Sequence, residues 1–196
     1  MSFSKIRRSP WFFWLGAMIV TLLAAGCVSG PKGTAEEKRL YFQKLEETAL
    51  ADLVQKYPEA EKLVEDSVGY AVIEKKIVKV PVLGAGGGVG VVLEKEGVKR
   101  TYLKVPELQF GAGWGGRGEH VVILFQDVEK LRKLAGGMWH SGISAEAAAK
   151  AGDVGAAGGA ATDTDKKGYH MYVLTGAGVS ATVTLNVLRV QPYTLK

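Results

Sequence analysis

The residues best suited to catalysis are few and scattered in this chain of 196 residues. Its three histidines, His120, His140 and His170, have no partner four residues away, and no H-E-x-x-H sequence is present. No G-x-S-x-G sequence marks a nucleophile either. The acidic pairs at 36–37 and 46–47 fall on a predicted helix, where we expect a solvated face. The sequence therefore predicts no enzyme, no metal site and no cofactor.

A glycine-rich loop that holds phosphate is the next chemistry to consider. Gly111, Gly113 and Gly116 fit the pattern G-x-G-x-x-G, but that pattern binds phosphate only where a helix follows. Residues 121–125 (VVILF) come next, and their β-branched and aromatic side chains favour a strand. No G-x-x-x-x-G-K-[ST] sequence occurs, so we exclude a nucleotide loop. The glycines from Gly84 onward instead predict bulges, bends or close backbone approach in a sheet.

A binding surface has more support, because cations and aromatic residues recur on predicted strands. The candidate binding residues are Lys75, Lys79, Arg100, Tyr102, Lys104, Trp114 and Arg117. Side chains two residues apart share a face of a strand, so Lys75 and Lys79 lie together and Lys76 opposes them. Arg100, Tyr102 and Lys104 share one face of a hairpin in the same way. The alternative is that edge-strand lysines only discourage aggregation.

Residues 1–26 have the order of a secretory signal peptide. A start with three cations and no acid precedes an apolar run over 11–23, which is short for a membrane-spanning helix. Small residues at 24–26 follow, and then Cys27, the only cysteine. The Arg-Arg pair at 7–8 fits twin-arginine export poorly, because Ser-Pro comes directly after it. We therefore expect export rather than a membrane span.

The residues around Cys27 resemble the lipobox of bacterial lipoproteins, L-(A/S)-(G/A)-C. Residues 25–27 match it, whereas Ala24 takes the place of the usual Leu and Leu23 lies one position upstream. The resemblance implies cleavage before Cys27 and lipid attachment to it, with several acyl chains that anchor stably where one would not. Val28 is not the Asp that retains such proteins at the inner membrane. We therefore expect anchoring in the outer membrane of a Gram-negative bacterium, facing the periplasm.

Removal of the signal peptide changes the charge of the chain. The whole chain carries +5, from 25 Lys+Arg and 20 Asp+Glu. Three of the cations lie in residues 1–26, so the mature chain carries 22 minus 20, or +2. This small excess gives no reason to expect nucleic-acid binding. With Cys27 modified no disulfide can form, and the 47% hydrophobic content lets the domain rely on its own core.

Local patterns predict a linker over 27–33 and a single domain over 34–196. Thr34 and Glu37 form a capping box for a helix, and Pro58 ends this helix before a shorter one. The expected strands are 69–73, 77–83, 86–93, 98–105, 108–114, 121–125, 169–174 and 179–190.

Turn and cap residues separate these elements. Gly97 suits the turn of the hairpin between the third and fourth strands, and Pro106 should interrupt the chain before the next one. Asp127 caps a helix over 128–135. Residues 145–150 have high helix propensity, but nearby glycines break any longer helix. The sum is an α+β fold, with a few helices flanking a Gly-rich antiparallel sheet.

Five segments, in the right order, resemble the SYLF domain, a lipid-binding module of bacterial lipoproteins and eukaryotic endocytic proteins. They are Ser67–Ile73, Leu83–Val91, Phe110–Gly116 with the strand and helix after it, Ala149–Gly155 and Thr175–Ala181. The similarity extends over about residues 51–190. It implies a twisted, barrel-like sheet in which residues 147–155 are extended rather than helical.

The resemblance also implies a function. By analogy with the family, the basic residues of this chain would contact anionic lipid headgroups, each contributing on the order of 1 kcal/mol near a charged surface. The chain departs from the family pattern at residues 73–75, 115–117 and 175–178, which bears on individual ligand contacts. We expect a lipoprotein that binds lipid, with phospholipid favoured. The alternative is an adaptor that binds another envelope protein through its sheet. An exposed apolar groove would favour lipid, and a flat polar sheet face would favour the adaptor.

Overall fold

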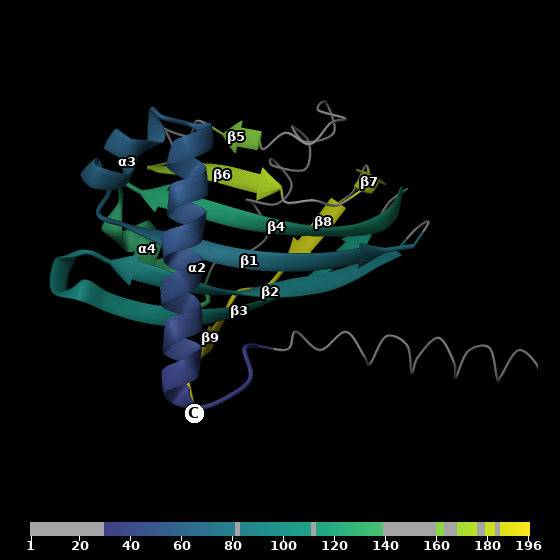
Figure 1. The fold of residues 1–196 in the computed structure, drawn as a ribbon, viewed down its shortest axis with the longest axis horizontal. Coiled ribbons are helices and arrows are strands. Elements are labelled where there is room, and N and C mark those ends of the chain that lie inside the picture. Colours follow the sequence, from purple (N-terminus) through teal and green to yellow (C-terminus); the bar gives the residue numbers. More distant parts are fainter. Residues whose placement is uncertain are drawn as a thin grey trace, which may run out of the picture.

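The computed structural model describes residues 30–80, 83–110, 113–138, 160–162, 168–175, 179–182 and 185–196. One antiparallel sheet forms the centre of the domain (Figure 1). Helix α2 (Ala35–Lys56) crosses one face of the sheet, and the shorter helix α4 (Val128–Ala135) packs on the other. The expected α+β class with an antiparallel sheet is confirmed.

The first helix of the domain begins at its predicted cap. The Thr34 hydroxyl accepts from the Glu37 N–H at 3.2 Å, and the Glu37 carboxylate accepts from the Thr34 N–H at 2.7 Å. Two backbone donors that a helix start would otherwise leave unpaired are satisfied in this way. Tyr57 ends α2, and α3 (Ala60–Asp66) follows the turn at Pro58. Both helix predictions are confirmed.

Four long strands form the middle of the sheet. They are β1 (Gly69–Lys79), β2 (Leu83–Glu94), β3 (Lys99–Phe110) and β4 (Gly113–Phe125). The shorter strands are β5 (Ala160–Thr162), β6 (Tyr169–Thr175), β7 (Val179–Thr182), β8 (Leu185–Leu188) and β9 (Gln191–Tyr193). The hydrogen-bonded order is β5-β6-β4-β1-β2-β3-β8, with β7 beside β4 and β9 beside β3. Among the described strands this order does not close into a barrel.

The predicted β2–β3 hairpin is confirmed. Glu94 pairs with Lys99 at its end, and Gly97 in the turn has a φ of 77°, a left-handed conformation that glycine adopts without a steric penalty. The cap of α4 is confirmed as well, because the Asp127 carboxylate accepts from the N–H groups of Glu129 and Lys130 at 2.9 and 3.4 Å.

Two predicted breaks are wrong. β1 runs unbroken through residues 73–77. Pro106 lies inside β3, opposite Gly87 of β2. On its other side β3 pairs with β9 only up to Lys104 and with β8 only from Glu107. The Pro106 carbonyl accepts a hydrogen bond from the Arg189 N–H at 3.3 Å. The N–H that proline lacks therefore faces the short link between β8 and β9, outside the regular pairing of either strand.

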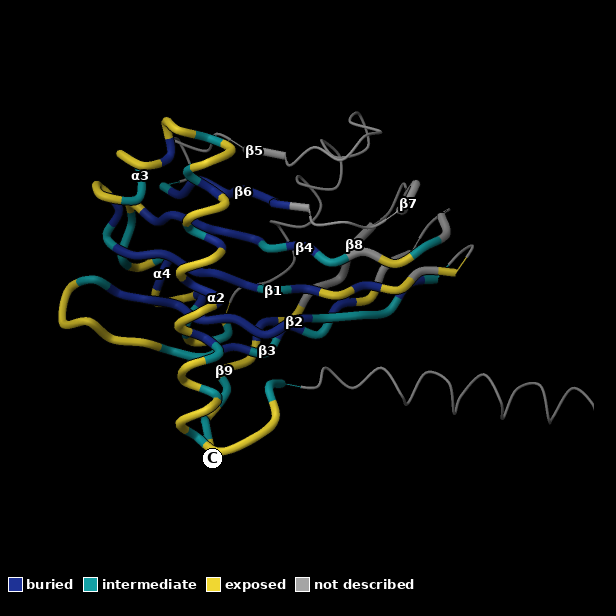
Figure 2. The backbone as a smooth tube through the Cα atoms, viewed as in Figure 1, coloured by how far each residue is buried: buried dark blue, intermediate teal, exposed yellow. Residues whose placement is uncertain are grey.

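The sheet has two buried faces, named here for the helices that pack on them. On the α2 face, Phe42, Leu45 and Leu53 of the helix meet alternate residues of the sheet such as Val72 and Val91. The α4 face has a second apolar cluster, which Leu131 and Leu134 of α4 cover. Figure 2 shows that the strands are buried mainly in the half that lies near α2, α3 and α4, and that exposure increases toward their other ends. Residues 145–155, for which propensity and resemblance made different predictions, lie outside the described ranges.

Candidate functional site

Lys75 is buried on the α4 face between two carboxylates from different strands. Its ammonium lies 2.7 Å from Oε1 of Glu119 on β4 and 2.8 Å from Oε2 of Glu107 on β3. Burial alone would lower the pKa of Lys75, but attraction to both carboxylates outweighs burial and raises it. Although Lys75 was predicted as a ligand contact, its charge is already engaged inside the fold.

A glycine on the strand between them gives Lys75 room to reach Glu107. Gly88 of β2 pairs with Lys75 on one side and Val105 on the other. A methyl group at Gly88 would lie 2.9 Å from Cγ of Lys75 and 2.1 Å from the backbone oxygen of Glu74. The glycine-rich run of β2 is therefore regular strand in close backbone contact, one of the three roles the sequence predicts for it.

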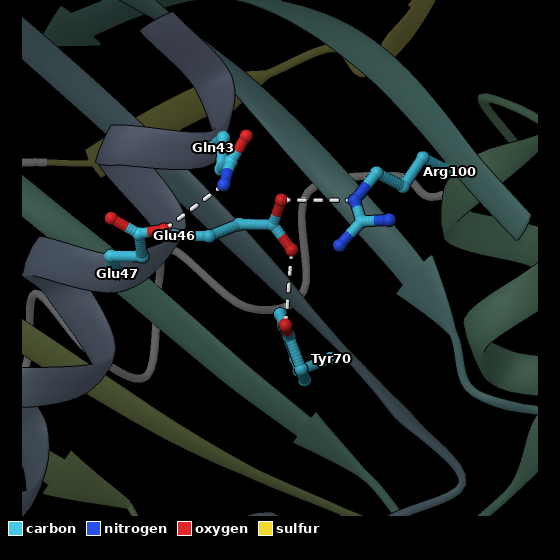
Figure 3. A network of polar contacts seen from close by, with 5 residues as sticks. All are labelled: Gln43, Glu46, Glu47, Tyr70 and Arg100. Carbon is cyan, nitrogen blue, oxygen red and sulfur yellow. Dashed lines mark hydrogen bonds and ion pairs between the residues drawn. The ribbon is translucent and has the colours of Figure 1, made fainter. Parts of the chain in front are cut away.

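Arg100 lies on the α2 face, where it binds the helix. Its Nε donates to Oε2 of Glu46 at 3.1 Å, and the Tyr70 hydroxyl donates to Oε1 of the same carboxylate at 3.0 Å (Figure 3). The hydrogen bond to Glu46 raises the pKa of Arg100, against the opposing effect of burial. Burial and the nearby Glu46 carboxylate both raise the pKa of Tyr70.

The solvated face expected for residues 46–47 is wrong for Glu46. Only 4% of Glu46 is exposed, whereas Glu47 is exposed and accepts a hydrogen bond from Gln43 at 3.1 Å. The helical period places Glu46 beside Phe42 and Ala49 in the apolar stripe. An acid inside such a stripe is a sequence signal for a buried pair, and Arg100 with Tyr70 supplies the partners. This network attaches α2 to the sheet.

Lys104 and Tyr102 lie on the α2 face near the start of the described chain. Tyr102 packs against Phe42 of α2, with ring centroids 4.8 Å apart. The Lys104 ammonium lies 4.4 Å from the centroid of the Tyr193 ring, a cation–π contact. Gly30 is close to both groups of that contact, since a Cβ built on it would lie 3.4 Å from Cε of Lys104 and 3.5 Å from the Tyr193 hydroxyl.

Both ends of the domain meet at this corner of the molecule. The Lys38 ammonium, in the first turns of α2, donates to the backbone oxygen of Lys196 at 2.7 Å. Gly30 and Tyr193 are adjacent as described, and Figure 1 shows the linker before α2 beside the C-terminus. The chain toward Cys27 therefore leaves the domain next to Lys104.

Glu74 marks the border of the part of the sheet that α2 covers. Its carboxylate accepts a short hydrogen bond from the Tyr41 hydroxyl of α2 and lies 3.0 Å from the Lys76 ammonium. Burial would raise the pKa of Glu74, but the hydrogen bonds from Tyr41 and Lys76 hold it below its ordinary value. Lys76, by contrast, is largely exposed.

Beyond Glu74, none of the described helices covers the α2 face of the sheet. Val78 pairs with Ala85, which pairs in turn with Leu108, so three apolar residues form a row across β1, β2 and β3. Val78 and Leu108 are 67% and 45% exposed. We call this region, with the next row of Lys76, Gly87 and Pro106, the distal face. Figure 1 shows these strands extending past α2, toward the ends that lie away from α3 and α4.

The other predicted site residues divide into two groups. Lys79 belongs to β1, and Trp114 and Arg117 belong to β4, but their side chains are not among those the structure describes. Of the candidates, Arg100, Tyr102 and Lys104 share one face as predicted. Lys75 lies on the opposite face. Sequence reasoning missed Glu107 and Glu119, although each continues an alternating apolar stripe, after Val105 and before Val121.

A separate hollow of about 400 Å³ lies between α4 and the β2–β3 hairpin. Val92, Leu131 and Ala135 form its apolar part, and Lys99 and Arg132 line it with Glu94. Arg132 already forms a short ion pair with Glu94, and that contact lowers the pKa of the carboxyl group. No predicted site residue lines this hollow.

Other chemistry finds no support in the described residues. Within them, no three His, Cys, Asp or Glu side chains cluster as metal ligands would. His170 is buried and lies 3.1 Å from the Gln126 amide, His120 is partly buried, and His140 is outside the described ranges. None of the described helices is both long and apolar enough to cross a membrane.

Comparison with known proteins gives one distant relative. No family model matches the chain. The chain is 31% identical over 108 residues to Beta cell expansion factor A of Aeromonas veronii. That match covers 55% of this chain and 41% of the relative, so the chain spans about two fifths of the relative's length.

Proposed function

We propose that this protein is a periplasmic lipoprotein, anchored through Cys27 in the outer membrane, whose domain binds membrane phospholipid. The observation that carries the proposal is the position of Gly30 against Lys104 and Tyr193. Cys27 lies three residues before Gly30, and three residues of extended chain span about 10 Å. An acyl anchor on Cys27 would therefore hold Lys104 within reach of the headgroups.

The chemistry of this corner fits an anionic headgroup. A lysine over an aromatic ring has an apolar stem that can lie at an interface while its ammonium meets phosphate. Each such lysine contributes about 1 kcal/mol near an anionic surface. Lys75 and Arg100 make no part of this proposal, because carboxylates inside the fold already bind them.

The proposal includes a domain of the SYLF type, as the resemblance implies. A SYLF-like domain would have a barrel-like sheet, and two pairings support such a shape at one end. β7 pairs with β4 and β8 pairs with β3, so short strands close in sequence reach both sides of the four central strands. The alternative function is an adaptor for an envelope protein, and the tests below distinguish it from lipid binding.

Two measurements test the proposal. Mass spectrometry of the full chain made in a bacterial host should find a mature N-terminus at Cys27 that carries acyl chains, and Cys27→Ala should release the protein from the membrane fraction. Native mass spectrometry of residues 28–196, followed by lipid extraction, should find copurified phospholipid. An unmodified Cys27, together with no lipid in extracts and no binding to phosphatidylglycerol vesicles at low salt, would contradict the proposal and favour the adaptor.

A further inference from the structure

We infer that the distal face contacts the bilayer and inserts Val78 and Leu108 at the level of the headgroups. This inference rests on the proposed lipid anchor at Cys27. It goes further because it assigns one surface of the sheet to the membrane and fixes the orientation of the domain.

The shape and composition of the distal face fit a lipid surface. The outermost row joins Val78, Ala85 and Leu108 across three strands. The next row contains Gly87 and Pro106, which have little or no side chain to stand out from the sheet. Exposed apolar residues that form a contiguous patch usually mark an interaction site. Val80, directly after β1, adds a further exposed apolar side chain at this end.

The charges of this surface are also those an anionic membrane selects. Lys76 lies in the second row. A third row, on the same face, joins Glu74, Val89 and Lys104. The one carboxylate that these three rows place on this face is Glu74, and Tyr41 and Lys76 already bind it. Glu107 and Glu119 belong to the same strands but lie on the other face, around Lys75. Cations that flank an apolar patch are typical of interfacial membrane binding.

The position of the proposed anchor indicates that the bilayer, and not another protein, binds the distal face. Lys104 is in the same strand as Leu108 and on the same face, so the chain at Gly30 leaves the domain beside this surface. A second copy is a poorer partner, because a twofold interface would bring the same patch of both copies together. Lys76 and Lys104 of one copy would then face those of the other, and like charges oppose association.

A labelling experiment on the full chain tests the orientation. Cys27 is the only cysteine, and lipid attachment would block its thiol, so a single new cysteine can be labelled cleanly. The variants are Val78→Cys and Leu108→Cys on the distal face, with Val98→Cys as the control. Val98 is 67% exposed, as is Val78, but lies at the opposite end of the strands beside Gly97. Each lipidated variant carries an environment-sensitive fluorophore and is reconstituted into vesicles of phosphatidylethanolamine and phosphatidylglycerol with nitroxide-labelled lipid.

The expected result is a blue shift and nitroxide quenching at positions 78 and 108, and neither effect at 98. Urea unfolding of each labelled variant verifies that the fold is kept. Quenching at none of the positions, or mainly at 98, would overturn the inferred orientation while the protein still floats with the vesicles, and the proposed function would stand. A blue shift without quenching would show that a second copy of the chain, not lipid, covers the distal face, and would also overturn the inference. If the chain carries no lipid and fails to float, the proposed function fails as well.

Discussion

At the scale of single residues, the most informative group is Lys75. A buried ion pair adds little stability over a well-packed apolar group, but removing one partner leaves an uncompensated buried charge. Lys75 is such a partner for two carboxylates on different strands. It therefore ties β1 to both β3 and β4 on the α4 face, and its role is to hold the fold.

Lys75→Met should lower the free energy of unfolding by about 3–5 kcal/mol, because Glu107 and Glu119 would lose the charge between them. The neighbouring Lys76→Met is the matched control, since Lys76 is largely exposed. We expect that change to stay within about 0.5 kcal/mol. Urea denaturation at neutral pH measures both. Equal effects of the two substitutions would show that the buried cluster does not constrain the sheet.

The contact between Tyr41 and Glu74 predicts an acid dependence of stability. The pKa of Glu74 is lower in the folded protein than its ordinary value of 4.5, so the folded state binds fewer protons than the unfolded state in the acid range. The stabilisation is present above about pH 4.5 and is lost as the pH falls through the lowered pKa. In Tyr41→Phe, which lacks one of the hydrogen bonds, the loss should be smaller.

Urea midpoints between about pH 6 and pH 3 provide the comparison. Tyr57→Phe is the control, because the Tyr57 ring packs at a tilt against Tyr172, at a centroid distance of 5.3 Å, away from Glu74. We expect the control to keep the acid dependence of the unsubstituted protein. A Tyr41→Phe variant with the same pH dependence as that protein would exclude this hydrogen bond as a cause.

At the scale of elements, the glycines of β2 decide how closely the strands approach. A methyl group at Gly88 would lie 2.1 Å from the backbone oxygen of Glu74. Gly88→Ala should therefore destabilise the protein by about 1–3 kcal/mol through strain and displacement of Lys75. Gly116→Ala on β4 is the control, since the nearest atom would be 3.7 Å away, and its effect should be at most about 0.5 kcal/mol. Thermal unfolding distinguishes them, and similar melting temperatures would refute the steric account.

Elements with local signals could be predicted from the sequence. Thr34 with Glu37, Asp127 and Gly97 each satisfy or permit the local backbone, so the starts of α2 and α4 and the β2–β3 turn follow from a few neighbouring residues. Pro106 misled the strand assignment. Its missing N–H faces the link between β8 and β9, two strands that come from far along the chain, so the residues around Pro106 could not show that β3 continues through it.

The site was harder to predict for the same reason. Alternation along β3 correctly placed Arg100, Tyr102 and Lys104 on one face, because that depends only on strand geometry. It could not show that Arg100 meets Glu46 of α2, a residue 54 positions away. Nor could it show that Gly88 lets Lys75 reach Glu107. Contacts across strands and helices depend on register and packing, which single segments do not encode.

At the scale of the whole molecule, binding to anionic vesicles should depend on where its lysines lie. With residues 28–196 alone, Lys76→Gln together with Lys104→Gln should weaken binding to phosphatidylglycerol vesicles about 30-fold, if each cation contributes about 1 kcal/mol. The control pair is Lys56→Gln with Lys133→Gln, which makes the same change in net charge away from the distal face. Co-sedimentation at low salt measures both. Equal weakening would indicate a response to net charge alone, without a defined surface.

The meeting of the two chain ends at one corner has a consequence for redesign of the protein. Because Gly30 lies beside Tyr193 and Lys38 binds the backbone oxygen of Lys196, a short peptide could join the ends, and the chain could be reopened at the exposed turn around Gly97. Such a circular permutant would keep every strand pairing but carry the proposed lipid anchor at the opposite end of the sheet. The anchor would then lie far from the distal face. The orientation of the permutant on the membrane would show whether the anchor or the surface residues determine it.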